Sequence, residues 1–150
     1  MKLIRPTWDE YFIKIAQDVS LRATCLRRLY GAVIVDKDHV IVSTGYCGAP
    51  RGEINCTTLG VCERQRLNVP SGERYELCRS VHAEQNAVIS GSSERMKGGT
   101  IYVAGVHPEN GELADAKPCF LCRRVIKNAQ IENVIYLTKE GIKTIKTIDL

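Results

Sequence analysis

The stretch "GAVIVDKDHVIVSTG", residues 31–45, holds two short apolar runs on either side of a polar pair, Lys37 and Asp38. Both runs are dense in β-branched residues, which favour the extended backbone of a strand. Two such runs joined by a short polar turn are typical of an antiparallel hairpin. The sequence therefore predicts that residues 31–45 form two neighbouring strands of a sheet.

The segments outside this hairpin alternate between helical and extended patterns. Upstream, Thr7 and Glu10 match a capping box, and apolar residues at near-helical spacing then predict a helix over residues 7–28. The order of elements predicts one three-layer α/β domain over residues 1–150, with a mixed sheet of about five strands. The downstream elements are two helices, two strands and a short last strand, expected over residues 81–89, 118–130, 99–106, 133–137 and 141–148 respectively.

Composition and charge narrow the possible classes of protein. The chain has 150 residues, of which 44% are hydrophobic and 25% charged, as in an ordinary folded domain. Its longest apolar runs are shorter than the ~18 residues of a membrane span, and its N-terminus lacks the apolar core of a signal peptide. We therefore expect a cytoplasmic protein that does not cross a membrane. The net charge of +4 is modest for a nucleic-acid binder but would attract a small phosphorylated ligand.

The chain holds seven cysteines, more than an average cytosolic protein carries. Disulfides do not persist in that compartment, so metal binding or catalysis is the leading explanation, and burial as small apolar side chains is the alternative. A second unusual feature is the stretch from Tyr46 to Arg79, which is rich in Gly, Pro and charge and lacks periodicity. A loop of that length in a compact domain needs something to hold it in place.

Two of the cysteines, Cys119 and Cys122, stand one helical turn apart at a predicted helix start, so both sulfurs can reach one ion. The positive end of a helix also favours the thiolate, the form that binds metal. A lone C-x-x-C is ambiguous among zinc binding, redox chemistry and chance. A thioredoxin-like motif would come earlier in the chain, however, and a structural zinc ribbon would need a second C-x-x-C.

His82 begins the predicted helix 81–89 and can supply a third ligand. Three protein ligands leave the fourth tetrahedral position of a zinc ion open for water, as catalytic sites require. A carboxylate beside the metal but outside its coordination shell could take and return protons, and Glu84 is the candidate. Side chains two positions apart on a regular helix diverge by about 200°. His82 and Glu84 can therefore act together only at an irregular first turn.

The motifs "VHAEQNAV" (81–88) and "PCFLC" (118–122) together resemble the H-x-E…P-C-x-x-C signature of zinc-dependent nucleobase deaminases. With "GAVIVD", "STGYCGAPRG" and "NAQIENVIY", the chain is similar to the deoxycytidylate deaminase group over about residues 7–137. The resemblance implies a cytidine deaminase-like α/β/α fold. It also implies hydrolytic deamination of dCMP to dUMP with release of ammonia, in which a zinc-bound hydroxide attacks the base and Glu84 shuttles the protons.

The resemblance also implies contacts and partners. The main chain of Ala83 would contact the pyrimidine edge. The chain would form a homo-oligomer, often a hexamer, and in some members dCTP and dTTP regulate the activity. Some phage members are similar in holding a structural zinc through cysteines that correspond to Cys25 and Cys56. Cys62 and Cys78 would complete a Cys₄ site that ties the long stretch to the scaffold, and free buried thiols are the alternative.

Two features of the sequence bear on the substrate. Arg51, in the glycine-flanked "GAPRG", is a candidate for contacting a phosphate, although a loop arginine can simply face solvent. Cys47 stands where many members have an asparagine thought to contact the sugar, and the longer segment "VHPENGELADAKPC" (106–119) remodels the loop beside the pocket. Another cytosine nucleotide or nucleoside therefore remains an alternative to dCMP.

Two further functions compete with this one. Editing of an RNA base would need an open basic face with aromatic stacking platforms, and two Phe and one Trp provide little. A catalytically silent zinc-binding interaction module would keep the cysteines without a proton shuttle, and the presence of Glu84 argues against it. The sequence therefore predicts an enzyme with zinc as its cofactor and a small nucleotide as its substrate, without a nucleic-acid partner.

Overall fold

A computed structural model describes the whole chain, residues 1–150, and contains one five-stranded sheet with the strand order β2-β1-β3-β4-β5. β3 and β4 pair in parallel and the other neighbours are antiparallel, so the sheet is mixed, as predicted. The strands are β1 (Leu29–Val35), β2 (Ile41–Tyr46), β3 (Thr100–Val106), β4 (Asn133–Thr138) and β5 (Gly141–Lys146). The helices are α1 (Trp8–Ser20), α2 (Cys56–Leu59), α3 (Glu63–Arg66), α4 (Ala83–Ser90), α5 (Ser93–Met96) and α6 (Phe120–Asn128). Short 3₁₀ turns occur at Tyr75–Leu77 and Thr147–Asp149.

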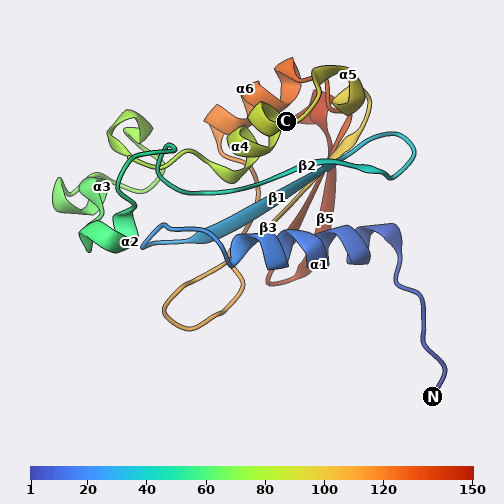
Figure 1. Cartoon of the computed structure of the whole chain (residues 1–150), viewed down its shortest axis with the longest axis horizontal. Helices are drawn as coiled ribbons and strands as arrows, with labels where there is room; N and C mark the ends of the chain where they lie inside the picture. The colour runs from blue at the N-terminus through green and yellow to red at the C-terminus, as the bar shows by residue number, and fades with distance from the viewer.

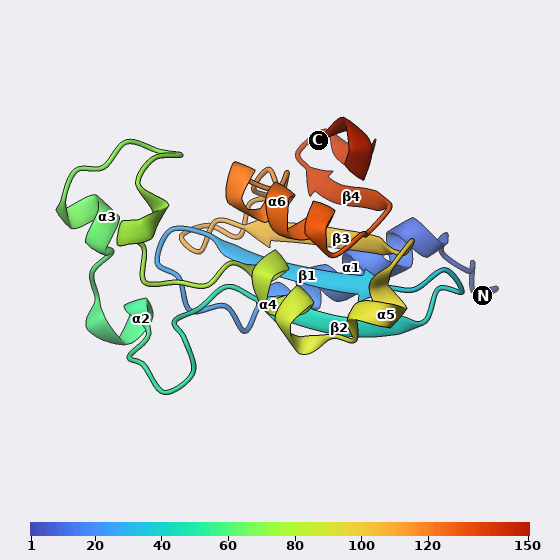
Figure 2. The same ribbon diagram turned by 90° about the horizontal axis from the view of Figure 1, so that it is seen from above.

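Helices cover both faces of the sheet. Figure 1 shows α1 on one face and α4, α5 and α6 on the other, and Figure 2 shows α4 lying over β1 and β2. Side chains alternate along a strand, so the apolar run of β1 serves both layers. Val33 packs in the buried cluster that includes Phe12 of α1, whereas Ile34 packs in the cluster that includes Ala87 of α4. The predicted three-layer α/β/α arrangement is confirmed. None of the helices has the length and apolar character needed to cross a membrane.

The first helix is shorter than its sequence pattern predicts. Its start is as expected, because the Thr7 N–H donates to Oε1 of Glu10 and the Glu10 N–H donates to Oγ1 of Thr7, at 3.2 and 3.1 Å. The expected end at residue 28 is wrong, since α1 stops at Ser20. Beyond it, the Thr24 N–H donates to the Cys47 carbonyl at 3.0 Å. A tertiary hydrogen bond therefore replaces the helical ladder, and residues 21–28 become the approach to β1.

The long aperiodic stretch, residues 46–79, extends beyond one end of the sheet and holds only single helical turns, α2 and α3 and the 3₁₀ turn (Figure 1). Its two ends meet, because Gly48 and Val81 exchange backbone hydrogen bonds of 3.2 and 2.7 Å. This closure brings the chain back to the sheet one residue before His82. The insertion therefore delivers the start of α4 to the same end of the sheet where β2 finished.

Close packing between β2 and α4 depends on Gly45. A Cβ atom placed there would lie 2.4 Å from the Ala83 carbonyl oxygen and 2.4 Å from the Ala87 backbone nitrogen. Both are atoms of the α4 backbone, which cannot move aside as a flexible side chain would. The absence of a side chain at residue 45 lets the first turn of α4 lie directly on the sheet.

Candidate metal centre and active site

His82 and Cys119 occupy the same position in two different helices, each standing immediately before the first turn. His82 precedes α4 with φ −72° and ψ 155°, and Cys119 precedes α6 with φ −70° and ψ 170°. Both backbones are extended at these residues, so their side chains do not follow the helical spacing. The His82 N–H also donates to Oε1 of Gln85 at 2.8 Å, which holds the turn. The irregular first turn that His82 and Glu84 require is therefore present.

Three potential metal ligands meet where α4 and α6 begin. The ligand atoms of His82, Cys119 and Cys122 lie within 4.8 Å of one another. Nδ1 of His82 is 3.2 Å from Sγ of Cys122 and 3.4 Å from Sγ of Cys119. A tetrahedral zinc ion with ordinary bond lengths would hold such nitrogen and sulfur atoms about 3.6 Å apart. One imidazole and two thiols therefore fit zinc both in chemical type and in spacing.

The surroundings of the two sulfurs favour the thiolate form at Cys119. The hydrogen bond from the Cys122 thiol, together with the neighbouring His82, lowers the pKa of Cys119 to about 4. The pKa of Cys122, which donates this hydrogen bond, is raised. Hydrogen bonding to Cys119 raises the pKa of His82 above its ordinary value. Since thiolates are the form that binds zinc, Cys119 is prepared for the metal at neutral pH.

Glu84 lies in the first turn of α4 and is only 6% exposed. Burial raises the pKa of its carboxyl group, and the nearby His82 opposes that rise. Its side chain lies within hydrogen-bonding reach of Cys122 but is not one of the three clustered ligands. A buried carboxyl group beside a metal, with a raised pKa, can hold a proton in one step and release it in the next.

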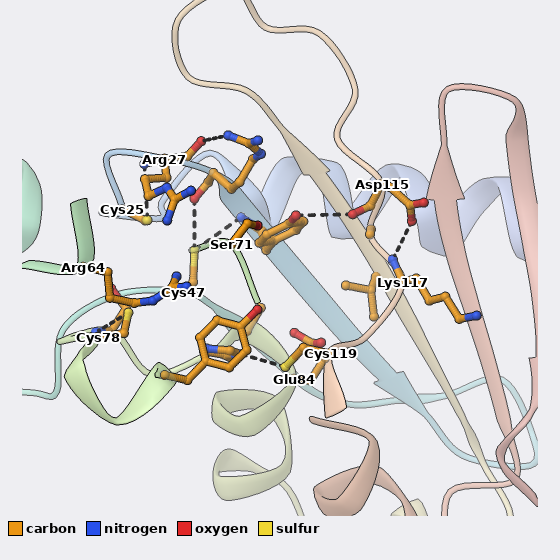
Figure 3. Close-up of a pocket in the computed structure, with 18 of the residues that line it drawn as sticks. Cys25, Arg27, Cys47, Arg64, Ser71, Cys78, Glu84, Asp115, Lys117 and Cys119 are labelled. Atoms are coloured by element: carbon orange, nitrogen blue, oxygen red, sulfur yellow. Dashed lines mark hydrogen bonds between the residues drawn. The ribbon is translucent and has the colours of Figure 1, made fainter. Parts of the chain in front are cut away.

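A cavity of about 400 Å³ opens beside the cluster, and His82, Ala83, Glu84 and Cys119 line it (Figure 3). Cavities of this size commonly hold small ligands. Tyr30, at the start of β1, forms part of another wall, and its hydroxyl group donates to the Asp115 carbonyl at 3.2 Å.

The residues that the sequence proposes for substrate contact lie in different places. Ala83 is fully buried and lines the cavity. Arg51 lies exposed in a turn and is not one of the lining residues. Cys47 lines the cavity, accepting from the Tyr30 N–H at 3.4 Å and donating to the Arg28 carbonyl at 3.5 Å. Burial raises the pKa of Cys47 to about 12, so it offers the cavity a neutral thiol whose hydrogen bonds are already used.

The sequence does not indicate Arg64 and Tyr75, which form a further wall of the cavity. The Tyr75 ring meets the His82 ring edge to face, with centroids 5.3 Å apart and planes at 85°. The Arg64 guanidinium carbon lies 4.7 Å from the Tyr75 ring centroid. Both residues belong to the aperiodic stretch, where residue spacing predicts no contacts. Their only signal in the sequence is their position between Cys62 and Cys78.

The second metal site was expected to be held by four cysteines, Cys25, Cys56, Cys62 and Cys78. They lie in one region, but their sulfurs are not close enough together to share an ion. The only compact group of potential metal ligands in the chain is that of His82, Cys119 and Cys122. Three of the four line the cavity and Cys56 is buried. Burial raises the pKa of Cys56, and the other three sulfurs are close enough to add to the rise. A backbone N–H group two residues further on approaches the sulfur of Cys25 at 3.4 Å and that of Cys78 at 3.5 Å. None of these four cysteines forms a disulfide.

Fold and site together define an α/β domain in which one histidine and two cysteines cluster at a spacing that fits zinc, beside a ligand-sized cavity. The model of the cytidine and deoxycytidylate deaminase zinc-binding region matches residues 6–138, and the chain belongs to this family. The match includes all three clustered ligands and Glu84.

Individual relatives agree with this assignment. The chain is 38% identical to the deoxycytidylate deaminase of Mycobacterium phage D29, over 88% of this chain and 95% of the phage protein. It is 34% identical to the deoxycytidylate deaminase of Schizosaccharomyces pombe, over 89% of this chain, but it spans only 38% of that longer protein. Among solved structures, it is similar to the dCMP deaminase of cyanophage S-TIM5, with a TM-score of 0.61 and 27% identity over 89% of this chain and 85% of that chain. The cyanophage enzyme has also been crystallised with dCMP and dUMP.

Proposed function

We propose that the protein catalyses the hydrolytic deamination of dCMP, taking up one water molecule and releasing dUMP and ammonia. The observation that carries this proposal is the buried carboxyl group of Glu84 beside three zinc ligands, at the edge of a cavity that could hold a nucleotide. The names of the phage and yeast relatives support cytosine nucleotides over other substrates. The crystallised complex of the cyanophage enzyme supports the same reactant and product.

The residues of the chain divide the chemistry among them. His82, Cys119 and Cys122 would hold the zinc ion, which when bound acts as a Lewis acid and lowers the pKa of a coordinated water. Glu84 would accept one proton from that water and deliver it to N3 of the cytosine ring as the water oxygen adds to C4. It would then take the second proton of the same oxygen and deliver it to the amine at C4, so that ammonia leaves as the C4 carbonyl group of dUMP forms. The main chain of Ala83, which lines the cavity, would orient the pyrimidine edge. The buried position of Glu84 keeps bulk water from competing for these protons.

Ammonia release from a panel of substrates tests the proposed activity. The zinc-loaded protein is incubated with dCMP, CMP, deoxycytidine and AMP, and with a transfer RNA. We expect release from dCMP at a kcat/KM at least about tenfold above that for the other compounds, because the phosphate and the sugar both add contacts. Release from the transfer RNA alone would instead favour RNA editing. Silence on every compound would favour a zinc-binding interaction module.

We further propose a second, structural zinc site formed by Cys25, Cys56, Cys62 and Cys78. It is supported by the closeness of the other three sulfurs to Cys56 and by the backbone N–H groups near Cys25 and Cys78. The sulfurs would have to move closer together to share an ion, and metal binding often supplies such order to a loop that lacks a core of its own. The homo-oligomeric state and the cytoplasmic location also remain predictions, and light scattering on the purified protein tests the first.

The metal content of the purified protein tests the second site. We expect about two zinc ions per chain, because one histidine nitrogen and two sulfurs would hold the first ion and the four cysteines of the proposed second site would hold the other. Cys62→Ser should lower the content to about one and make residues 46–79 more sensitive to protease, because the insertion loses its cross-link. Cys47→Ser serves as the matched control and should keep both ions. A wild-type content of one ion would contradict the second site.

A further inference from the structure

Arg64 is a buried cation without an anionic partner. It is only 6% exposed and forms no ion pair with any carboxylate. Its Nε donates to the Glu73 carbonyl and its Nη2 to the Pro70 carbonyl, both at 3.0 Å, and its guanidinium plane lies over the Tyr75 ring. Burying an arginine charge is costly unless hydrogen bonds or an opposite charge compensate. These contacts fix the guanidinium group in place but leave its charge unpaired.

The edge of the guanidinium group that is not used by the loop is open to the cavity. Nη1 of Arg64 has no hydrogen-bond partner in the protein. It is nevertheless not fully buried, because the only fully buried side-chain polar atom without a partner is Oγ1 of Thr147. Arg64 lines the cavity. The access that remains to this otherwise buried residue is therefore through the cavity beside the metal centre.

A second cation lies on the same side of the cavity. Arg27 lines it, and the Arg27 side chain forms no hydrogen bond and no ion pair. Figure 3 shows Arg27 and Arg64 together on the side away from Asp115 and Lys117. The neighbouring Arg28, in contrast, uses Nη1 to donate to the Arg27 carbonyl at 2.6 Å. Two guanidinium groups with unused donors thus face one end of the cavity.

The separation between Arg64 and the metal centre suits a nucleotide. One aromatic ring, that of Tyr75, separates the Arg64 guanidinium group from the imidazole of His82. In a nucleoside monophosphate, one sugar ring separates the base from the phosphate. A base placed against Glu84 and the zinc ligands would therefore carry its phosphate towards Arg64 and Arg27.

We infer that Arg64 and Arg27 form the binding site for the 5′-phosphate of the substrate. This inference rests on the proposed function and names the part of the site that separates nucleotides from nucleosides. A guanidinium group held rigidly by its other donors binds phosphate oxygens without loss of side-chain freedom. Desolvation within the cavity strengthens the attraction. Arg51, the arginine that the sequence suggests for this role, lies outside the lining of the cavity.

The kinetic test compares dCMP with deoxycytidine, which lacks only the phosphate. We expect Arg64→Gln and Arg27→Gln each to lower the ratio of the two kcat/KM values by about 10- to 100-fold, the effect of losing a hydrogen bond to a charged group. Arg66→Gln, which removes an exposed arginine of the same short helix, is the matched control and should leave the ratio unchanged. Arg64 also holds the loop at Pro70 and Glu73, so Arg27→Gln decides the result if Arg64→Gln fails to fold. An equal fall for both substrates, or a ratio lowered only by Arg51→Gln, would overturn the inference.

Equilibrium binding separates this inference from the proposed reaction. Calorimetry on the zinc-loaded protein measures dUMP and deoxyuridine, neither of which requires turnover. We expect the wild type to bind dUMP at least about tenfold more tightly than deoxyuridine, and Arg27→Gln to lose that preference. A wild type that binds both equally would overturn the phosphate site even if dCMP is deaminated. A wild type that prefers dUMP but releases no ammonia would leave the phosphate site supported and contradict the reaction.

Discussion

Glu84→Gln is expected to lower kcat for dCMP deamination by about 10²- to 10⁴-fold, the usual contribution of a positioned proton-transfer group. Glutamine has nearly the same shape, so the fold and the cluster of His82, Cys119 and Cys122 should remain intact. What the variant lacks is a group that can accept a proton and later return it. The zinc content should therefore stay at the wild-type level while turnover is lost.

Two measurements on the same preparation check this expectation. Ammonia release gives kcat, and elemental analysis gives zinc per chain. Glu94→Gln is the matched control, because Glu94 is 85% exposed and lies on α5, away from the cavity. It should resemble the wild type in both measurements. Activity that survives in Glu84→Gln would show that another group moves the proton, and loss of zinc would show that Glu84 contributes to metal binding.

Replacement of Cys119 by serine is expected to abolish activity through loss of the metal. A serine hydroxyl group is not ionised at neutral pH, whereas hydrogen bonding from Cys122 holds the pKa of Cys119 at about 4. Changes to residues that only support metal ligands already cost about 10- to 100-fold in metal affinity or activity. Loss of a ligand should exceed that range, so zinc should leave Cys119→Ser during gel filtration in a dilute chelator.

The loss of zinc also has a stability readout that does not depend on catalysis. A ligand that binds only the folded state raises the free energy of unfolding. The melting temperature of wild type should therefore rise on adding zinc, and that of Cys119→Ser should rise much less. Cys47→Ser, a buried cysteine outside the cluster, controls for the loss of a thiol and should respond to zinc as wild type does. An equal response in Cys119→Ser would exclude Cys119 as a ligand.

Much of the fold could be predicted, because in those segments the local sequence pattern and the tertiary packing favour the same secondary structure. The hairpin at residues 31–45 has β-branched residues on both strands and a polar turn, and both faces of β1 are buried. The start of α1 follows from a capping box that its own residues complete. The clustering of His82, Cys119 and Cys122 was also predictable, because each motif stands at a helix start and the two motifs occur together.

The features that could not be predicted depend on contacts between segments far apart in the chain. The helical pattern of residues 21–28 is overridden by the hydrogen bond from Thr24 to Cys47, which lies beyond the hairpin. Arg64 and Tyr75 lie beside the metal centre because the insertion, residues 46–79, folds back on itself. The sequence of the insertion has no periodicity that would predict this fold. The short helix α5 was not among the expected elements, although Ser92 accepts from the Arg95 N–H at its start. Single helical turns carry too few residues to show a pattern.

The tight contact at Gly45 shows which wall of the active site cannot be altered by protein engineering. Any larger residue at position 45 would push on the backbone at the start of α4, which carries His82 and Glu84. Attempts to redesign the enzyme should therefore leave Gly45 unchanged. The connection between β3 and α6, residues 107–117, borders the same cavity. Its Ala114 and Ala116 are buried and donate backbone hydrogen bonds to Gly105 and Leu137 of the sheet, whereas residues 108–112 are exposed. Libraries that vary its length and composition are the natural way to seek new substrates.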